Sequence, residues 1–364
     1  MKIHIKKLIF IAMTLVILFW ISGCDLFRGE PTVYVAGNCL NSASTAEIPC
    51  YWQDDVRIDL PVLTGTENGY GDGIWVSVTD IYLSGTSKHS SGPVADLNLP
   101  CYWKNGGVNS LTVSDPLKGG DGRRMFVNGS DIYIAGNTRI GGDWHLLPAY
   151  WKNGIRSDLP PRTAGYSSLA YGIFIDGSNV YVCGHGDDSA AVRYPVYWKN
   201  RTLVTLPGLV GSKSGWARDI AVSGADVYAA GHSCDASYKE NPCYWKNGVL
   251  NTLPMLDTAK SGEAYALWID GEDIYIAGYT RNSANTPVPC YWENGERVDM
   301  EIVSATYGGQ ARDIMVVNGD IFMSGQIHDG TIFQPCWWKN DTRTDLPALD
   351  PSRGGEARAI FVVE

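Results

Sequence analysis

The segment RDIAVSGADVYAAGHSCDASYKENPCYWKNGVLNTLP, residues 218–254, contains the features on which the fold of this chain depends. It holds four short apolar runs. Ser-Gly at 223–224 separates the first two runs, and Lys-Asn-Gly at 246–248 separates the last two. Gly and Asn accept the positive φ angles of tight hairpin turns, so the segment predicts four antiparallel strands, which we call A to D in chain order.

The same unit occurs seven times along the chain. The phrase typified by VYVAG begins at residues 33, 81, 132, 180, 227, 274 and 321, and each copy is followed by a phrase of the type CYWKNG. The tryptophan of this second phrase recurs at Trp52, Trp103, Trp151, Trp198, Trp245, Trp292 and Trp338. A four-stranded unit repeated about every 47 residues predicts one blade of a β-propeller per repeat.

The two ends of the repeat region favour a closed ring. The chain enters the first repeat at strand B, and an isolated strand A, RAIFVV at 358–363, comes last. This last strand can complete the blade that begins at Val33, which removes both open edges. An open solenoid of hairpins is the competing fold, but it would need polar caps at its ends. We therefore expect an all-β, seven-bladed propeller over residues 32–364.

The strand order resembles that of kelch and related propellers over residues 31–364. The paired glycines of kelch strand B are Ala-Gly or Ser-Gly here, so the resemblance implies the fold and no function. The chain also resembles bacterial lipoproteins that are built from YVAG…YWKNG repeats, and that resemblance supplies no activity.

The N-terminus has the pattern of an export signal. Lys2, Lys6 and Lys7 precede the apolar run 8–21, and Ser22-Gly23-Cys24 follows it. The Ile-Ser-Gly-Cys sequence resembles the bacterial lipobox. It implies a signal peptide at 1–23, acylation of Cys24, a tether at 24–31 and a protein held in the cell envelope on its periplasmic or surface side. An ordinary signal peptide or a signal anchor is the alternative.

Composition excludes several classes of protein. Hydrophobic residues make up 45% of the chain and charged residues 19%, which does not fit a disordered chain. The net charge is −10, and it becomes −13 if residues 1–23 with their three lysines are removed, so nucleic acid is not an expected partner. We expect membrane attachment through acyl chains only, no cofactor and a monomer.

A candidate ligand site follows from strand A. Its second repeat position would lie at the mouth of the central channel, on the face that also carries the long and variable B–C and D–A loops. This position holds four arginines and two tyrosines, side chains that suit a carboxylate-bearing or sulfated glycan or an acidic peptide: Arg123, Tyr171, Arg218, Tyr265, Arg312 and Arg358. Asp72 is the seventh member. The alternative is that Arg218–Asp219 and Arg312–Asp313 form ion pairs between blades.

Most other conspicuous residues have a structural explanation. We expect the seven tryptophans to be core. Five cysteines share one repeat position with Ala149 and Val196, which indicates a small apolar site: Cys50, Cys101, Cys243, Cys290 and Cys336. Cys39–Cys50 and Cys234–Cys243 are possible disulfides.

We expect His185 and His232 to begin loops, with metal binding as the alternative. Five aspartates before strand B resemble hairpin-turn residues, with calcium as the alternative: Asp80, Asp131, Asp226, Asp273 and Asp320.

The sequence contains no G-x-S-x-G, P-loop, G-x-G-x-x-G or H-E-x-x-H motif. We therefore expect a binding module that recognises a glycan or protein on the loop-rich face, rather than an enzyme. A protein-interaction scaffold without a small-molecule site is the second hypothesis. A glycoside hydrolase or lyase is the third, because propeller enzymes assemble their sites from several blades.

Overall fold

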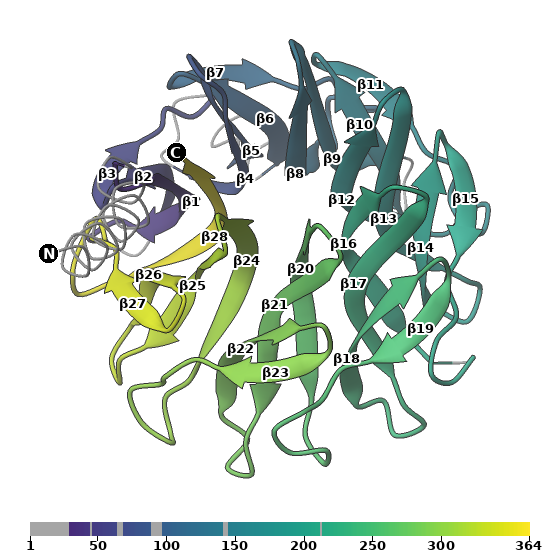
Figure 1. The fold of residues 1–364 in the computed structure, drawn as a ribbon. Coiled ribbons are helices and arrows are strands. Elements are labelled where there is room, and N and C mark those ends of the chain that lie inside the picture. The colour runs from purple at the N-terminus through teal and green to yellow at the C-terminus, as the bar shows by residue number, and fades with distance from the viewer. Residues whose placement is uncertain (1–28, 44–45, 64–67, 89–96, 141–144, 212) are drawn as a thin grey trace, which may run out of the picture.

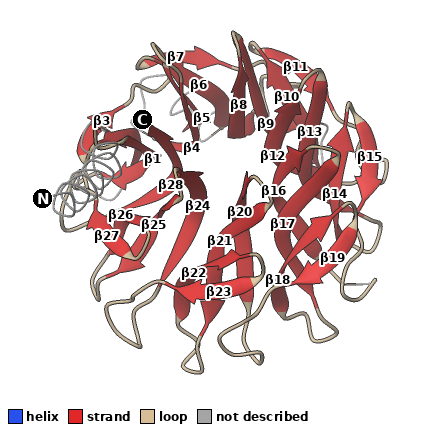
Figure 2. Ribbon diagram, in the orientation of Figure 1, coloured by secondary structure: helices blue, strands red, loops and turns tan. Residues whose placement is uncertain are grey.

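A computed structural model describes residues 29–43, 46–63, 68–88, 97–140, 145–211 and 213–364. These residues form seven sheets of four antiparallel strands, arranged in a ring around a central channel (Figure 1). All elements of regular structure in the described part of the chain are strands (Figure 2). The expected class, an all-β propeller with seven blades, is confirmed. The described residues contain no helix of the length and apolarity needed to cross a membrane. Cys24 and the predicted signal peptide lie outside the described residues.

Each blade has the strand order A-B-C-D from the channel outward. The innermost strands A are β4 (Gly69–Val76), β8 (Gly120–Asn128), β12 (Ser168–Asp176), β16 (Gly215–Ser223), β20 (Gly262–Asp270), β24 (Gly309–Val317) and β28 (Gly355–Val363). The strands B are β1 (Thr32–Leu40), β5 (Ile81–Lys88), β9 (Asp131–Ile140), β13 (Asn179–Asp187), β17 (Asp226–Cys234), β21 (Asp273–Arg281) and β25 (Asp320–His328).

The outer half of each blade is a short hairpin. The strands C are β2 (Glu47–Gln53), β6 (Asn98–Lys104), β10 (His145–Lys152), β14 (Arg193–Lys199), β18 (Glu240–Lys246), β22 (Pro287–Glu293) and β26 (Phe333–Lys339). The strands D are β3 (Val56–Asp59), β7 (Gly107–Ser110), β11 (Ile155–Asp158), β15 (Thr202–Thr205), β19 (Val249–Thr252), β23 (Glu296–Asp299) and β27 (Thr342–Asp345). We number the blades 1 to 7, with the sheet that contains β1 as blade 1 and the sheet that contains β24 as blade 7.

Blade 1 joins the two ends of the repeat region. Its sheet has the order β28-β1-β2-β3, and β28 pairs with β1 in the register Val33↔Val362 and Val35↔Ile360. The last strand therefore closes the ring as predicted, and it leaves neither end of the array as an open sheet edge.

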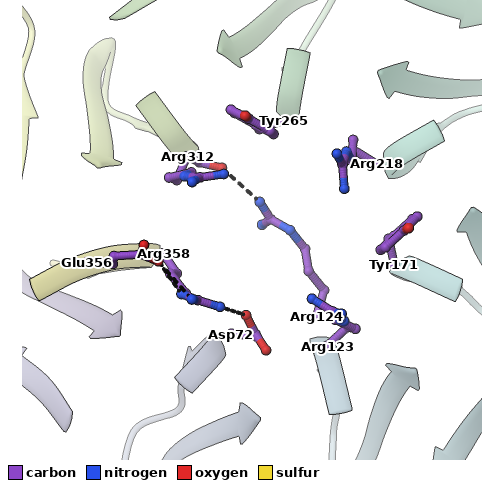
Figure 3. Close-up of a pocket in the computed structure, with 9 residues that line it drawn as sticks. All are labelled: Asp72, Arg123, Arg124, Tyr171, Arg218, Tyr265, Arg312, Glu356 and Arg358. Carbon is purple, nitrogen blue, oxygen red and sulfur yellow. Dashed lines mark hydrogen bonds and ion pairs between the residues drawn. The ribbon is translucent and has the colours of Figure 1, made fainter. Parts of the chain in front are cut away.

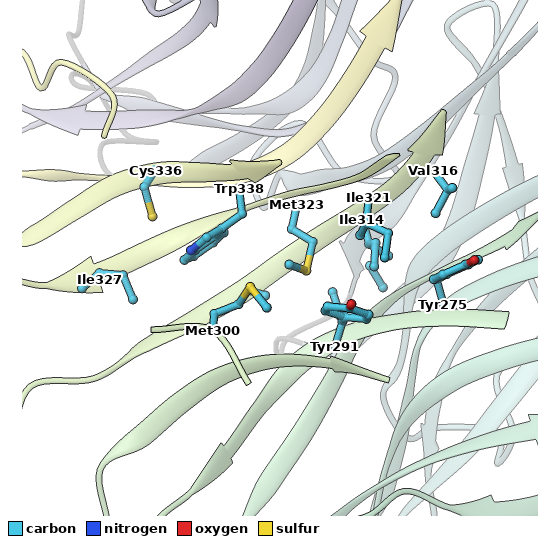
Figure 4. Close-up of a cluster of buried hydrophobic side chains, with 13 residues drawn as sticks. Tyr275, Tyr291, Met300, Ile314, Val316, Ile321, Met323, Ile327, Cys336 and Trp338 are labelled. Atoms are coloured by element: carbon cyan, nitrogen blue, oxygen red, sulfur yellow. The ribbon is translucent and has the colours of Figure 1, made fainter. Parts of the chain in front are cut away.

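The recurring tryptophans of strand C hold neighbouring blades together. All seven have an exposed fraction of 1% or less. The Trp198 indole N–H donates to the carbonyl of Pro160, which follows strand D of the preceding blade, at 2.8 Å. The same bond to the preceding blade recurs at Trp52, Trp103, Trp151, Trp245 and Trp292. Figure 4 shows one such interface, where Trp338 lies in a cluster with Met300 and Tyr291 of the adjacent blade. The prediction that these tryptophans are core is confirmed.

Two turns lie at the lower end of each blade, the A–B turn and the C–D turn. Side-chain hydrogen bonds connect them to each other. Asn153 begins the C–D turn of blade 3 at φ 51°, which an Asn side chain tolerates well. Its Oδ1 accepts from the Ile132 N–H at 2.8 Å, and its Nδ2 donates to Asp131 at 2.8 Å. The aspartates before strand B are thus turn residues. In the described part of the chain, no three His, Cys, Asp or Glu side chains gather in a way that could hold a metal ion.

Candidate functional site

Strand A of every blade bulges near the upper end of the channel, where the strands A begin and the B–C and D–A loops lie. In blade 5 the pairing with strand B shifts between Ala217 and Asp219, so Arg218 has no partner in the ladder. One residue is skipped in the same way in five other blades, and in blade 3 both Arg123 and Arg124 are left out of the ladder. A bulge turns the extra residue out of the sheet, and here it turns it toward the channel. The strand-B glycine opposite the bulge is required, because a Cβ on Gly231 would collide with the Trp216 carbonyl.

The bulge residues meet in one pocket of about 290 Å³ at the channel mouth (Figure 3). All six residues predicted to form the ligand site line it. Asp72, Arg124 and Glu356 complete the lining, and these three were absent from the predicted site. The pocket therefore presents five guanidinium groups and two tyrosine rings, contributed by strands A from six of the seven blades.

Arg124 crosses the channel below the other arginines. It comes from blade 3 and reaches blade 7, where its Nη1 lies 2.6 Å from Asp313 Oδ1 and its Nη2 donates to the Arg312 carbonyl at 3.2 Å. Its Nε lies 3.9 Å from Asp219 of blade 5. Burial raises the pKa of Asp219 to about 6, and the Arg124 charge opposes that rise. Arg124 thus forms the floor of the pocket.

Three arginines at the mouth are held in place by carboxylates. Arg358 pairs with Asp72 and with Glu356 at 2.8 Å, as Figure 3 shows. The other two pairs are Arg123–Asp121 and Arg218–Glu263, both at 3.1 Å. These ion pairs fix the direction of each guanidinium. Two of these pairs use the carboxylates of the pocket lining, Asp72 and Glu356, as acceptors.

Although Arg218 pairs with Glu263 of the next blade, the alternative ion pairs Arg218–Asp219 and Arg312–Asp313 do not form. The reason is the bulge, which turns the arginine into the pocket while the following aspartate stays in the sheet wall. Asp219 Oδ2 accepts from the Leu267 N–H and Asp313 Oδ2 from the Ile360 N–H, both at 3.0 Å, so each aspartate links two neighbouring blades through the backbone.

Arg312 differs from the other arginines of the pocket. In the described part of the chain no carboxylate lies within ion-pair distance of its guanidinium, whose Nε is buried without a hydrogen-bond partner. The guanidinium carbon lies 4.6 Å from the centre of the Tyr265 ring. Burial raises the pKa of the Tyr265 phenol, so this ring stays neutral beside the cation. Arg312 is therefore a positioned cation whose charge is not matched by a carboxylate.

His185 and His232 lie on either side of Trp216, next to the pocket. Their ring centres are 5.5 and 4.9 Å from the indole, and both side chains are at most 3% exposed. Burial lowers the pKa of His185 to about 3 and that of His232 to about 4. Both are thus neutral at pH 7. The Tyr171 hydroxyl lies 3.3 Å from His185 Nδ1, which ties this pair to the pocket wall.

The structure distinguishes the two cysteine pairs. All eight described cysteines are free thiols. Cys39 and Cys50 lie on one face of blade 1 with their sulfur atoms 3.9 Å apart, so their disulfide stays a prediction. Cys234 pairs with Glu240 in the ladder and is therefore three positions from the partner of Cys243. Side chains an odd number of positions apart point to opposite faces of a sheet, so a Cys234–Cys243 disulfide does not fit.

Comparisons with known proteins add only a general likeness of fold. No protein-family model and no curated protein sequence matches this chain. Among solved structures, the chain is similar to the β-propeller domain of the Trilobed protease from Pyrococcus furiosus, with 10% identity and a TM-score of 0.49, over 89% of this chain and 97% of that one. It is also similar to YjhT, with 10% identity and a TM-score of 0.43, over 79% of this chain and 99% of that one. Neither likeness bears on function.

Proposed function

We propose that this protein is a binding module of the cell envelope that captures an anionic group, a carboxylate or sulfate on a glycan or an acidic peptide, in the pocket at the channel mouth. Arg312 carries the proposal, because it is a half-buried cation, placed against the Tyr265 ring, that no carboxylate of the described chain neutralises. A guanidinium offers planar donors that match both carboxylate and sulfate oxygens. The N-terminal export signal and Cys24 support the envelope location.

The size of the pocket defines how much of the ligand it takes. About 290 Å³ is at the lower end of small-molecule sites, so it accommodates one charged unit of a longer ligand. The remainder of the ligand would lie over the upper face, along the B–C and D–A loops. Parts of these loops, such as residues 89–96 and 141–144, lie outside the described residues.

The ion-paired arginines supply oriented hydrogen-bond donors to the pocket but little net charge. A carboxylate neutralises each of them and fixes its guanidinium, so these arginines add little long-range attraction for a ligand: Arg123, Arg218 and Arg358. Tyr171 and Tyr265 add neutral rings to the same wall. This arrangement favours recognition of a shaped anionic unit over general binding of polyanions.

The test is an array of uronic acid-containing, sulfated and neutral glycans together with acidic peptides, probed with the wild-type protein and with Arg312→Ala. We expect binding only to anionic members, and at least tenfold weaker binding by the variant, which is about 1.4 kcal/mol. The unfolding midpoint should stay unchanged, because Arg312 forms no ion pair. Arg156→Ala is the matched control, since Arg156 pairs with Asp158 on the outer strand of blade 3.

Two results would overturn the proposal. One is binding that does not depend on the charge of the array member. The other is an Arg312→Ala variant that binds anionic members as tightly as Arg156→Ala and wild type do. Retention of a protein partner by both variants would instead favour a scaffold that works through its loops.

A further inference from the structure

Below Arg124 the channel changes its chemistry. The strands A turn six large apolar side chains and one alanine toward the lower part of the channel, one from each blade: Trp75, Phe126, Phe174, Ala221, Trp268, Met315 and Phe361. They line a chamber of about 390 Å³, which is separate from the pocket at the channel mouth. The six large side chains are only half-buried, because part of each faces this space.

The ring is ordered by contacts between its own members. Trp75 lies 4.6 Å from Phe126 and 5.0 Å from Phe361, measured between ring centres, and Phe126 lies 5.0 Å from Phe174 in an edge-on arrangement. These distances and tilts are those of favourable aromatic pairs. An arc of four aromatic residues therefore extends over four consecutive blades as a continuous wall.

Ala221 is the one small member of the ring. It stands in blade 5, between Phe174 of blade 4 and Trp268 of blade 6, and its side chain is 7% exposed. The wall is lower at this position than anywhere else in the ring. The chamber is thus asymmetric, with an aromatic arc on one side and a recess at Ala221.

The polar groups at the roof of the chamber are satisfied among themselves. Arg124 faces Asp219 and Asp313, and each of these aspartates also accepts a backbone N–H from the adjacent blade. The one guanidinium of the roof faces two carboxylates, so no unpaired cation of the roof attracts an anion into the chamber. Binding of a ligand in this space is favoured by the removal of aromatic and aliphatic surface from water.

We propose that the lower chamber is a second binding site, which takes an uncharged apolar molecule with a flat aromatic or short alkyl body. The volume of about 390 Å³ is that of a site for a small molecule, and the preformed aromatic arc supplies stacking surface for a flat body. Arg124 separates this site from the anion pocket, so the two ends of one channel bind ligands of opposite character.

The experiment titrates the protein with N-phenyl-1-naphthylamine, an uncharged aromatic probe whose fluorescence rises in apolar surroundings. We expect saturable binding at one site per chain. Ala221→Phe should fill the recess, and Met315→Gln should make the wall polar two blades further round the ring. Each change should weaken binding at least tenfold. Urea unfolding of each variant identifies those that fold, and Met315→Gln serves the test if the larger Ala221→Phe side chain prevents folding.

Two controls make the result specific. Val249→Gln changes an apolar side chain that is 64% exposed on the outer strand of blade 5, so it should leave binding of the probe unchanged. Arg312→Ala should also leave it unchanged, which separates this site from the anion pocket. Binding that is not saturable, or that is as strong in folded Met315→Gln as in wild type, would overturn the second site and leave the proposal for the channel mouth untouched.

Discussion

The tryptophan ring between the blades and the arginine-rich ring at the channel mouth come from the same seven repeats, yet they behave differently. The strand-C position is Trp in all seven blades and is buried in all seven. The bulge position of strand A holds one aspartate, four arginines and two tyrosines, and all of them line one pocket. Each tryptophan packs against the same part of the next blade, so every blade needs the same side chain at this position. The bulge residues instead all face one space, so they can differ from blade to blade and together form a single asymmetric site.

Replacing a member of the uniform ring should have the largest effect on stability. Trp198→Ala removes a fully buried indole and its bond to the Pro160 carbonyl, and we expect it to lower the free energy of unfolding by about 3–5 kcal/mol. The measurement is urea unfolding. The control is Trp337→Ala, whose ring stacks on Phe322 at 6.2 Å and donates to Asp55 at the surface. Equal losses in the two variants would contradict the assignment of the strand-C tryptophans as the packing between blades.

The two buried histidines next to the pocket should determine how the free energy of unfolding changes on acidification. His185 and His232 have folded-state pKa values of about 3 and about 4, below the ordinary value of 6.5. On acidification the unfolded chain therefore takes up protons first, and stability falls as the pH drops below 6.5. At pH 5 each histidine should cost at most about 2 kcal/mol relative to pH 7.

The double variant His185→Gln/His232→Gln isolates this effect. Glutamine is the natural residue at the same repeat position of blade 7, where Gln326 is buried. Asp219 works in the opposite direction, because its pKa is raised to about 6 and its contribution to stability falls as the pH rises through that value. Unfolding at pH 5 and pH 7 should show a smaller loss on acidification for the variant than for wild type. The same loss in both proteins would refute the assignment of neutral buried histidines.

The smallest effect is expected at the turns, which recur in every blade and are exposed. Asn247→Ala removes a residue at φ 51° and two hydrogen bonds, one from the Val227 N–H and one to Asp226. We expect a loss of about 1 kcal/mol in urea unfolding. Asn251→Ala is the control, since that side chain bonds only to a carbonyl of its own strand. If Asn247→Ala lowers the free energy of unfolding no more than Asn251→Ala does, the hydrogen bonds between the two turns contribute nothing to stability.

The sequence predicted the fold because its signals are local and repeated. The VYAAG and CYWKNG phrases define strands B and C, the Ser-Gly and Lys-Asn-Gly turns close the A–B and C–D hairpins, and the isolated strand at 358–363 indicates closure. The convergence of Arg218 and Arg312 on one pocket was also predictable, since equivalent positions of a closed ring face the same axis.

Other parts of the site depend on the dimensions of the ring. Arg124 reaches Asp313, 189 residues away, and only the width of the channel decides that contact. One signal was available, because Arg124 is the only long side chain at a repeat position that otherwise holds Gly, Asp or Ala. The alternative ion pair Arg218–Asp219 is ruled out by the bulge, which turns the two side chains in different directions. The strand-B glycine opposite each bulge was the available sign of it.

The pairing of β28 with β1 sets the order of events during synthesis. The ribosome makes β1 first among the strands, but its inner partner emerges only after the other six blades have been translated. Until then the nascent chain presents one side of β1 as an unpaired edge, which is open to association with other chains. Blade 1, the first blade to leave the ribosome, is consequently the last to be completed.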